Sequence, residues 1–155
     1  MSREKSSRVS ALYILAGKGK PGRKTKAVGV VEGKGIPGDA HFEDAKAPVS
    51  IAAADIGDWM AGQDTQGLCF ERFKANLWIK IPQEELKRVG KGTQLTCGKA
   101  VLEITNGKGR CFPECARVKQ GLPCRLREAC WYAVCVSGGI IREGDPVEMR
   151  QKNNE

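Results

Sequence analysis

The sequence predicts a mainly β fold, an all-β barrel or sandwich with a few short helices. Short runs of β-branched and aromatic residues recur along the chain, and turns rich in glycine separate them. The long alternation of strand and helix patterns that marks a doubly wound α/β fold is missing. A chain of 155 residues that is 41% hydrophobic can bury a core of its own, so we expect one domain over residues 1–155.

The elements follow from local patterns in chain order. Strand patterns cover residues 9–15, 27–32, 48–52, 76–81, 94–96, 100–105, 131–136 and 146–149. Residues 53–61 have a helical register that places Ile56, Trp59 and Met60 on one face, and a second helix is expected within 113–131. Cys97-Gly98-Lys99 predicts a tight turn between two strands. The domain core should span about 9–149, with residues 1–7 and 151–155 frayed.

The positive charge is concentrated at the start of the chain. The net charge is +8, but residues 1–26 alone carry eight Lys or Arg and a single acid, Glu4. A nucleic-acid-binding surface would spread basic residues along an element and interleave aromatics, so we expect no nucleic-acid partner. No apolar stretch is long enough for a membrane span or a signal-peptide core, so we expect a cytoplasmic protein with no membrane partner.

The basic segment Gly17–Thr25 superficially resembles a phosphate-binding P-loop. Arg23 stands where the motif needs Lys, and a strand pattern, not a helix, follows at residues 27–32. A P-loop depends on the N-terminal N–H groups of a following helix. We therefore expect a solvated, mobile loop over residues 17–26 that attracts anions at most weakly.

Seven cysteines in a chain expected to be cytoplasmic indicate burial, metal binding or reactivity before they indicate disulfides. Cys111 and Cys115 have the spacing of half a zinc site, but no matching second pair follows, and the only histidine, His41, is remote in sequence. A zinc-stabilised structural domain thus stays an alternative. The cysteines beside apolar residues are expected to pack in the core: Cys69, Cys97, Cys130 and Cys135.

Cys111 is the strongest candidate for a reactive thiol. It lies beside Arg110 and close to Lys108, just before an expected short helix in which Pro113 occupies the first turn. A helix N-terminus and nearby cations favour the thiolate, which is the nucleophilic form. Cys115, about one turn further on, is placed to resolve or accept. A structural role for Cys111 remains equally open on these grounds.

Asp39 and His41 form a second candidate pair, within Gly35-Ile36-Pro37-Gly38-Asp39-Ala40-His41. The glycines and the proline predict a turn, in which an Asp commonly caps the backbone. A purely structural turn is therefore the simpler interpretation, although an imidazole is also the usual acid–base group of proteins.

Taken together, these segments resemble the MOSC family, named for the C-terminal domain of molybdenum cofactor sulfurases. The matching segments run in the family's order and cover about residues 9–149: Gly38–His41, Pro48–Ile51, Phe73–Leu77, Val89–Leu95, Leu102–Thr105, Cys111 and Gly138–Asp145. The Cys111, Cys115 and Cys124 pattern is most similar to that of the small stand-alone bacterial members.

The resemblance implies a bent β-barrel with a cleft, in which Cys111 carries sulfur as a persulfide and Cys115 assists. It also implies that Asp39, His41, Asn76 and Arg110 contact the molybdenum cofactor (molybdopterin), and that Asp39 and His41 share one cleft with Cys111. No PLP-binding region is seen, so a cysteine desulfurase would donate the sulfur, and a molybdoenzyme or cofactor-biosynthesis protein would accept it. Two residues depart from the family pattern, Ala75 where Glu usually precedes the Asn and Phe112 where relatives have His. Both departures weaken acid–base catalysis more than thiol chemistry.

Three functions follow as expectations: a sulfur carrier or transferase, a module that binds or inserts the cofactor without covalent chemistry, and a zinc-stabilised structural domain. A reactive Cys111 would distinguish the sulfur carrier from the cofactor-binding module. The metal content of the purified protein would identify the zinc-stabilised domain.

Overall fold

The computed structural model describes residues 7–17, 20, 22–44, 48–65, 67, 74–107, 114–122, 125 and 129–151. The strands are β1 (Ser7–Leu15), β2 (Gly22–Thr25), β3 (Ala27–Val30), β4 (Val49–Ala53), β5 (Leu77–Lys80), β6 (Gln94–Cys97), β7 (Ala100–Gly107), β8 (Cys130–Ser137), β9 (Gly139–Arg142) and β10 (Pro146–Arg150). The helices are α1 (Ile56–Ala61), α2 (Gln83–Leu86) and α3 (Ala116–Lys119).

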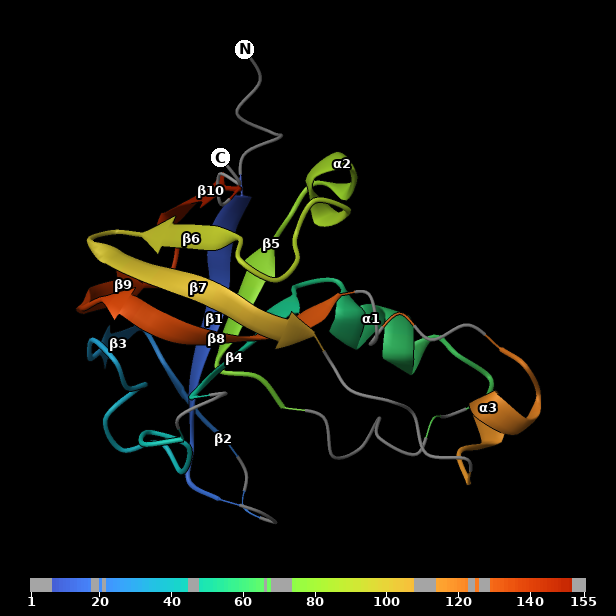
Figure 1. Ribbon diagram of the computed structural model, residues 1–155. Helices are drawn as coiled ribbons and strands as arrows, with labels where there is room; N and C mark the ends of the chain where they lie inside the picture. Colours follow the sequence, from blue (N-terminus) through green and yellow to red (C-terminus); the bar gives the residue numbers. More distant parts are fainter. Residues whose placement is uncertain are drawn as a thin grey trace.

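The main sheet closes on itself as a barrel (Figure 1). Its strand order is β10-β6-β7-β8-β4-β5-β1-β2, and a further pairing of β10 with β1 closes seven of these strands within the described part of the chain. Neighbouring strands run antiparallel except β4 and β5, which are parallel. Closure gives hydrogen-bond partners to the backbone N–H and C=O groups that the edge strands of an open sheet would leave unpaired. Strand β2 remains outside the closed ring as an extension paired only with β1.

A two-stranded ribbon of β3 and β9 packs against the barrel (Figure 1). Val28, Val30 and Ile141 of this ribbon belong to the same buried hydrophobic cluster as Val9 and Leu12 of the barrel. The ribbon therefore extends the main core. Because every second residue of a strand points inward, this cluster draws on alternate positions of the barrel strands.

A second, smaller cluster lies under α1. The buried side chain of Ile56 packs with small residues of β4 and with Cys130, and Trp59 and Met60 lie against this cluster. The predicted register of the first helix is therefore confirmed, although α1 begins at Ile56 and not at residue 53. None of the helices in the described residues is long and apolar enough to span a membrane.

The fold class predicted from sequence is confirmed. Three elements of the structure were not predicted: β2, β9 and α2. The predicted mobile loop of residues 17–26 is wrong in its second half, because Gly22–Thr25 forms β2 in register with Leu15–Leu12 of β1. Residues 139–142, for which no strand was predicted, form β9, and α2 was not predicted either. Both short strands are held by tertiary pairing, and the sequence of β2, Gly-Arg-Lys-Thr, carries little strand preference of its own.

The two segments predicted to fray each contribute an ordered residue. Ser7 is buried at the start of β1 and pairs with Val147 of β10. The Gln151 side chain accepts a hydrogen bond from the Thr93 hydroxyl at 3.0 Å and donates one to the Arg88 carbonyl at 2.9 Å. Barrel closure through β10 explains both corrections, because it brings the two ends of the domain into the sheet.

Candidate functional site

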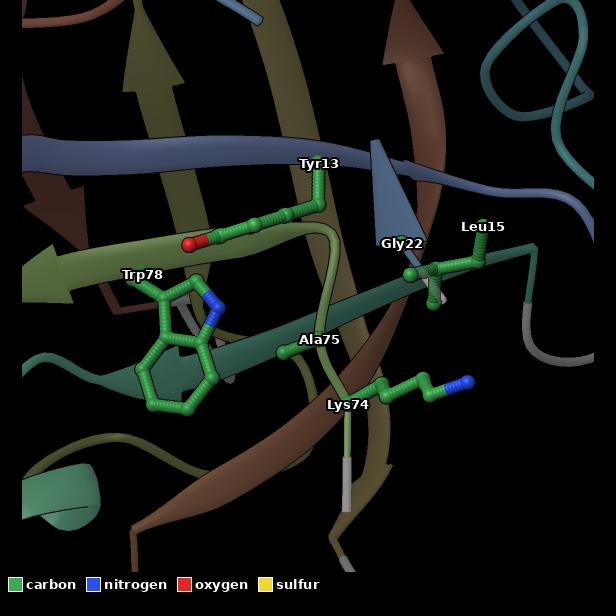
Figure 2. A pocket seen from close by; sticks show the side chains of 6 residues that line it. All are labelled: Tyr13, Leu15, Gly22, Lys74, Ala75 and Trp78. Carbon is green, nitrogen blue, oxygen red and sulfur yellow. The ribbon is translucent and has the colours of Figure 1, made fainter. Parts of the chain in front are cut away.

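A pocket of about 150 Å³ opens on the outer face of β1, β2 and β5 (Figure 2). Tyr13 and Leu15 are two residues apart on β1, so their side chains leave the same face of the strand. Trp78 of β5 lies opposite Ala11, which makes it the diagonal neighbour of Tyr13 on that face. Two aromatic rings from different strands therefore line one pocket.

The other end of the pocket is formed by Gly22, Leu15 and Lys74 (Figure 2). Gly22 lies directly opposite Leu15 in the β1–β2 pairing. A Cβ at Gly22 would lie 2.8 Å from Leu15 Cδ2 and 3.5 Å from Tyr13 Cδ2, so glycine keeps this end open. The half-buried Lys74 extends along the same end, and its ammonium donates a hydrogen bond to the Lys20 carbonyl.

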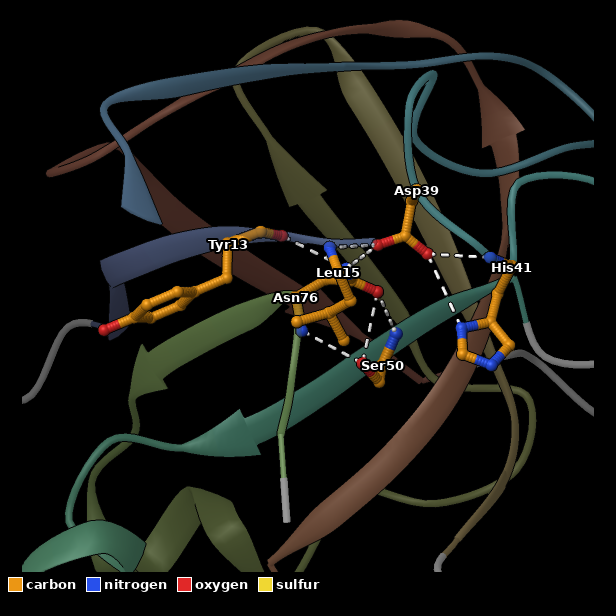
Figure 3. Close-up of polar contacts among 6 residues, drawn as sticks. All are labelled: Tyr13, Leu15, Asp39, His41, Ser50 and Asn76. Atoms are coloured by element: carbon orange, nitrogen blue, oxygen red, sulfur yellow. Dashed lines mark hydrogen bonds and ion pairs between the residues drawn. The ribbon is translucent and has the colours of Figure 1, made fainter. Parts of the chain in front are cut away.

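Beneath the pocket, a turn holds the buried Asp39 (Figure 3). Gly38 has φ +91°, a left-handed conformation that favours glycine, and this turn directs the next side chain into the protein. The Asp39 side chain is fully buried, and its Oδ1 accepts a hydrogen bond from the Leu15 N–H at 2.7 Å. Its Oδ2 accepts one from the His41 N–H at 3.0 Å. The carboxylate thus joins β1 to the 31–44 segment.

Asn76 completes the network from the entry to β5 and is 1% exposed. Its Nδ2 donates to Asp39 Oδ1 at 2.8 Å and to the Tyr13 carbonyl at 3.1 Å. Its Oδ1 accepts from the N–H and the hydroxyl of Ser50, at 2.9 and 3.1 Å. Both donors and both acceptor positions of the amide are used, so Asn76 ties β1, β4 and the Asp39 turn together.

The network and the pocket share the same stretch of β1. Tyr13 and Leu15 contribute side chains to the pocket and backbone groups to the network. Ala75, which precedes Asn76, also lines the pocket. Consequently, Asp39 and Asn76 act on the pocket by holding the backbone from which its side chains project.

His41 is the member of this group that reaches solvent. Its side chain is 57% exposed, and its Nδ1 lies 3.5 Å from Asp39 Oδ2 (Figure 3). The structure therefore brings together three of the residues predicted from the family resemblance, Asp39, His41 and Asn76. Their contact with the cofactor stays a prediction. Arg110 and Cys111 lie outside the described residues, so their place in the same cleft also stays a prediction.

Four cysteines are described, and each is a buried thiol: Cys97, Cys115, Cys130 and Cys135. The prediction of core packing is thus confirmed for Cys97, Cys130 and Cys135, whereas Cys69 lies outside the described residues. Among the described side chains, no three His, Cys, Asp or Glu residues group as metal ligands. The zinc alternative depends on Cys111 and Cys124, which are not among them.

The helix after the cysteine motif begins later than predicted. Cys115 has an extended backbone (φ −64°, ψ 129°) and is the N-cap of α3, which starts at Ala116. Pro113, expected in the first turn, lies outside the described residues. The N-terminus faces Cys115, which is 7% exposed, so the helix dipole does not support the reactivity of Cys111 as expected. The prediction that Cys111 is reactive therefore depends on its basic neighbours and on the family resemblance.

The buried thiols should have a measurable effect on stability at alkaline pH. Burial, with a smaller contribution from the Asp145 carboxylate, raises the pKa of Cys97 from 9.0 to about 12. Stability from the neutral thiol is fully present below pH 9 and is lost as the pH rises towards 12, because only the unfolded state ionises there. We expect a loss of up to about 1.4 kcal/mol per pH unit, which urea unfolding between pH 8 and 10.5 measures. Cys97→Ala should lose stability less steeply, and parallel curves would contradict the assignment.

No local sequence pattern marks Tyr13, Lys74 and Trp78 as pocket residues. Lys74 lies in one of the family-like segments, but nothing in its spacing distinguishes it from a surface lysine. The alternation of β1 places Tyr13 on the outer face, yet its meeting with Trp78 depends on the β1–β5 register. Ser50 was likewise not a predicted site residue, and its role emerges only from its contact with Asn76.

A closed, mainly β barrel with a buried Asp–Asn network beneath a small pocket defines the class of domain. The MOSC domain family matches residues 37–148, and the chain belongs to that family, which is generally linked to binding and sulfur roles around the molybdenum cofactor. No curated protein matches the sequence significantly.

Solved structures share the fold at low sequence identity. The chain is similar to the YuaD protein from Bacillus subtilis, with a TM-score of 0.69 and 17% identity over 96% of this chain and 97% of that one. It is also similar to YiiM from Escherichia coli (TM-score 0.58, 13% identity, 96% of this chain and 72% of that one). YiiM from Geobacillus stearothermophilus gives a TM-score of 0.59 at 12% identity, over 94% of this chain and 75% of that one.

Proposed function

We propose that this MOSC domain is a sulfur carrier for the molybdenum cofactor and receives sulfur on Cys111 as a persulfide. The observation that carries the proposal is the burial of all four described cysteines. A sulfur carrier needs an accessible thiolate. The described thiols do not meet this need, since burial raises the pKa of Cys97 and of Cys135 and encloses Cys115 and Cys130.

Of the three remaining cysteines, Cys111 has the most favourable surroundings in sequence. Cys69 is flanked by Leu68 and Phe70. Cys124 precedes Arg125, but that guanidinium forms two hydrogen bonds to the Asp55 carboxylate, at 3.0 and 3.4 Å, so its charge is already compensated. Cys111 follows Arg110 and lies near Lys108, and cations stabilise a thiolate.

The loading step is a thiol–persulfide exchange. The Cys111 thiolate attacks the outer sulfur of a persulfide on a cysteine desulfurase, and the donor's S–S bond breaks. The donor leaves as a thiolate, so the exchange needs no external oxidant or reductant. Because Cys115 is buried, an external thiolate would then attack the inner sulfur, release the outer atom as sulfide and stay bound to Cys111 as a mixed disulfide. The acceptor would be the cofactor on a molybdoenzyme or a cofactor-biosynthesis protein.

In this proposal, His41 contacts the cofactor at the exposed end of the polar network, together with Arg110. The exposure of His41 and the burial of Asp39 support a division of roles. His41 meets the ligand, while Asp39 and Asn76 position it.

The test is mass spectrometry of the protein after incubation with a cysteine desulfurase and cysteine. We expect the mass to rise by one sulfur atom, with the added atom on the peptide that contains Cys111. An added sulfur on Cys97 or Cys135 would refute the proposal. If no sulfur is gained although the desulfurase is active, binding of the cofactor without covalent chemistry becomes the better function, and the pocket supports it.

A further inference from the structure

Two arginines attach the segment that follows Cys111 to helix α1. The described part of this segment, residues 114–122 and 125, includes α3 and lies next to α1, outside the barrel (Figure 1). We infer that Arg117 is a positioning residue of the sulfur-loading reaction, because it fixes this segment on a helix that is itself anchored in the core. The inference rests on the proposed sulfur-carrier function and adds to it a residue that acts through the chain and not on the sulfur.

Arg117 is held by an aromatic ring and two oxygen atoms. It is 3% exposed, and its guanidinium carbon lies 5.0 Å from the centroid of the Trp59 ring of α1. Its Nη1 donates hydrogen bonds to the Thr65 carbonyl at 2.9 Å and to Gln63 Oε1 at 3.3 Å, both just past the end of α1. Burial of a charged group is unfavourable without partners. The segment is therefore stable in this position only while these contacts are made.

The helix that receives Arg117 has a fixed position on the barrel. Ile56 of α1 is fully buried in the smaller core cluster, with Ala52 and Ala53 of β4. Trp59 packs against the same cluster and contacts the Arg117 guanidinium. Because protein cores are close-packed, they do not deform continuously. Arg117 therefore transfers the position of the barrel, through α1, to the segment that follows Cys111.

A second arginine holds the far end of the segment. The Arg125 guanidinium donates to both carboxylate oxygens of Asp55, the N-cap residue of α1, at 3.0 and 3.4 Å. The side chains of this ion pair are 25% and 56% exposed. Exposed ion pairs contribute little to stability, whereas a buried guanidinium that loses its partners costs far more. We therefore assign the main positioning role to Arg117.

Sulfur transfer between two proteins needs a thiol that is held in place as well as accessible. The acceptor thiolate must approach the outer sulfur of the donor persulfide along the axis of the S–S bond, whereas a small alkylating agent reaches an accessible thiol from many directions. Cys111 lies four residues before Cys115, the buried N-cap of α3, and six before Arg117. Loss of the Arg117 contacts should therefore slow sulfur loading and leave the reaction with a small reagent unchanged.

The kinetics of the full chain can test this, with a cysteine desulfurase as the sulfur donor and iodoacetamide as the small reagent. Arg117→Gln should lower the loading rate at saturating desulfurase by about tenfold or more. The rate of alkylation and its pH midpoint should not change. Arg117→Lys keeps a cation over Trp59 but loses the planar fork of donors, so it should restore part of the loading rate. Arg88→Gln, at an exposed arginine that pairs with Glu85, is the matched control and should load like wild type.

A double-mutant cycle checks that Arg117 acts through its contact with Trp59. Trp59→Leu removes the ring under the guanidinium and should also slow loading. Because the two side chains touch, the effects should not add, and the double variant should load no more slowly than Arg117→Gln alone. Thermal unfolding shows that each variant is folded at the assay temperature. Should Arg117→Gln not fold, Arg117→Lys and Trp59→Leu test the same contact.

An Arg117→Gln protein that loads sulfur like wild type would overturn the inference and leave the sulfur-carrier function intact. Equal falls in loading and alkylation, or a higher pH midpoint of alkylation, would also overturn it, because Arg117 would then act on the thiol itself. If the wild-type protein gains no sulfur from an active desulfurase, the sulfur-carrier function fails, and the inference fails with it.

Discussion

Protein in which Cys111 is replaced by serine should gain no sulfur from a cysteine desulfurase, whereas the wild-type protein gains one atom per chain. Serine is similar in size, but its hydroxyl cannot form a persulfide. The rate of alkylation of the native protein at pH 7 should also fall by about tenfold or more, because the accessible thiolate is lost and the described thiols are buried. Intact-protein mass spectrometry and time-resolved labelling measure the two effects.

Two further cysteine variants serve as controls. Cys97→Ala removes a buried thiol that the proposal does not use, so it should load sulfur and react with alkylating agents like wild type. Cys115→Ser should also load sulfur on Cys111 like wild type, because the buried Cys115 thiol takes no part in loading. Unchanged loading of the Cys111→Ser protein would refute the mechanism and leave the MOSC fold assignment intact.

Replacing Asn76 with leucine should destabilise the protein more than a substitution at an exposed position does. The substitution removes the Asn76 partner of the Tyr13 carbonyl and of the Ser50 N–H, and it takes away one of the two hydrogen bonds to Asp39 Oδ1. We expect a loss of about 3 kcal/mol or more, since each unsatisfied buried group costs roughly 1–3 kcal/mol. The midpoint of urea unfolding should fall by roughly 1–2 M.

Asn76→Asp separates the effect of hydrogen bonding from that of shape. The substituted side chain has nearly the same outline but, when ionised, would place a carboxylate oxygen against Asp39 and the Tyr13 carbonyl. It should therefore be destabilised strongly at pH 7 and less at pH 4, where a protonated carboxyl can donate. Asn106→Asp, at an exposed position of β7, is the matched control and should change stability by less than about 0.5 kcal/mol. A loss of similar size at both positions would contradict the network's role.

The alternation of apolar and polar residues in the sequence was sufficient to predict the barrel strands that show it. Val9–Leu15, Ala100–Thr105 and Trp131–Val136 all lie within observed strands, because alternating burial leaves a signal at every second residue. The tight turn at Gly98, which has φ +61°, was predicted for the same kind of local reason. In contrast, Gly22–Thr25 is a strand only because β1 offers it a partner, and no local pattern reports that pairing.

The candidate site, like the strands, could be predicted from the sequence only in part. The local sequence predicts the turn at Gly38-Asp39. The order of family-like segments predicts that Asp39, His41 and Asn76 belong to one site. That the carboxylate and the amide are buried and saturated, while only His41 is exposed, depends on where β1, β4 and β5 meet. Side chains more than 20 residues apart have no sequence signal for such a contact.

The sequence by itself determined the fold class, most of the barrel strands and the family, since each depends on patterns that are local or recur in order. Only the tertiary structure decided that Tyr13, Trp78 and Lys74 share a pocket, because a strand's register sets which side chains become neighbours across it. The same holds for Cys115, which has the spacing of a reactive thiol in sequence. Packing of the segment before α3 buries it, and burial rather than spacing governs access to a thiol.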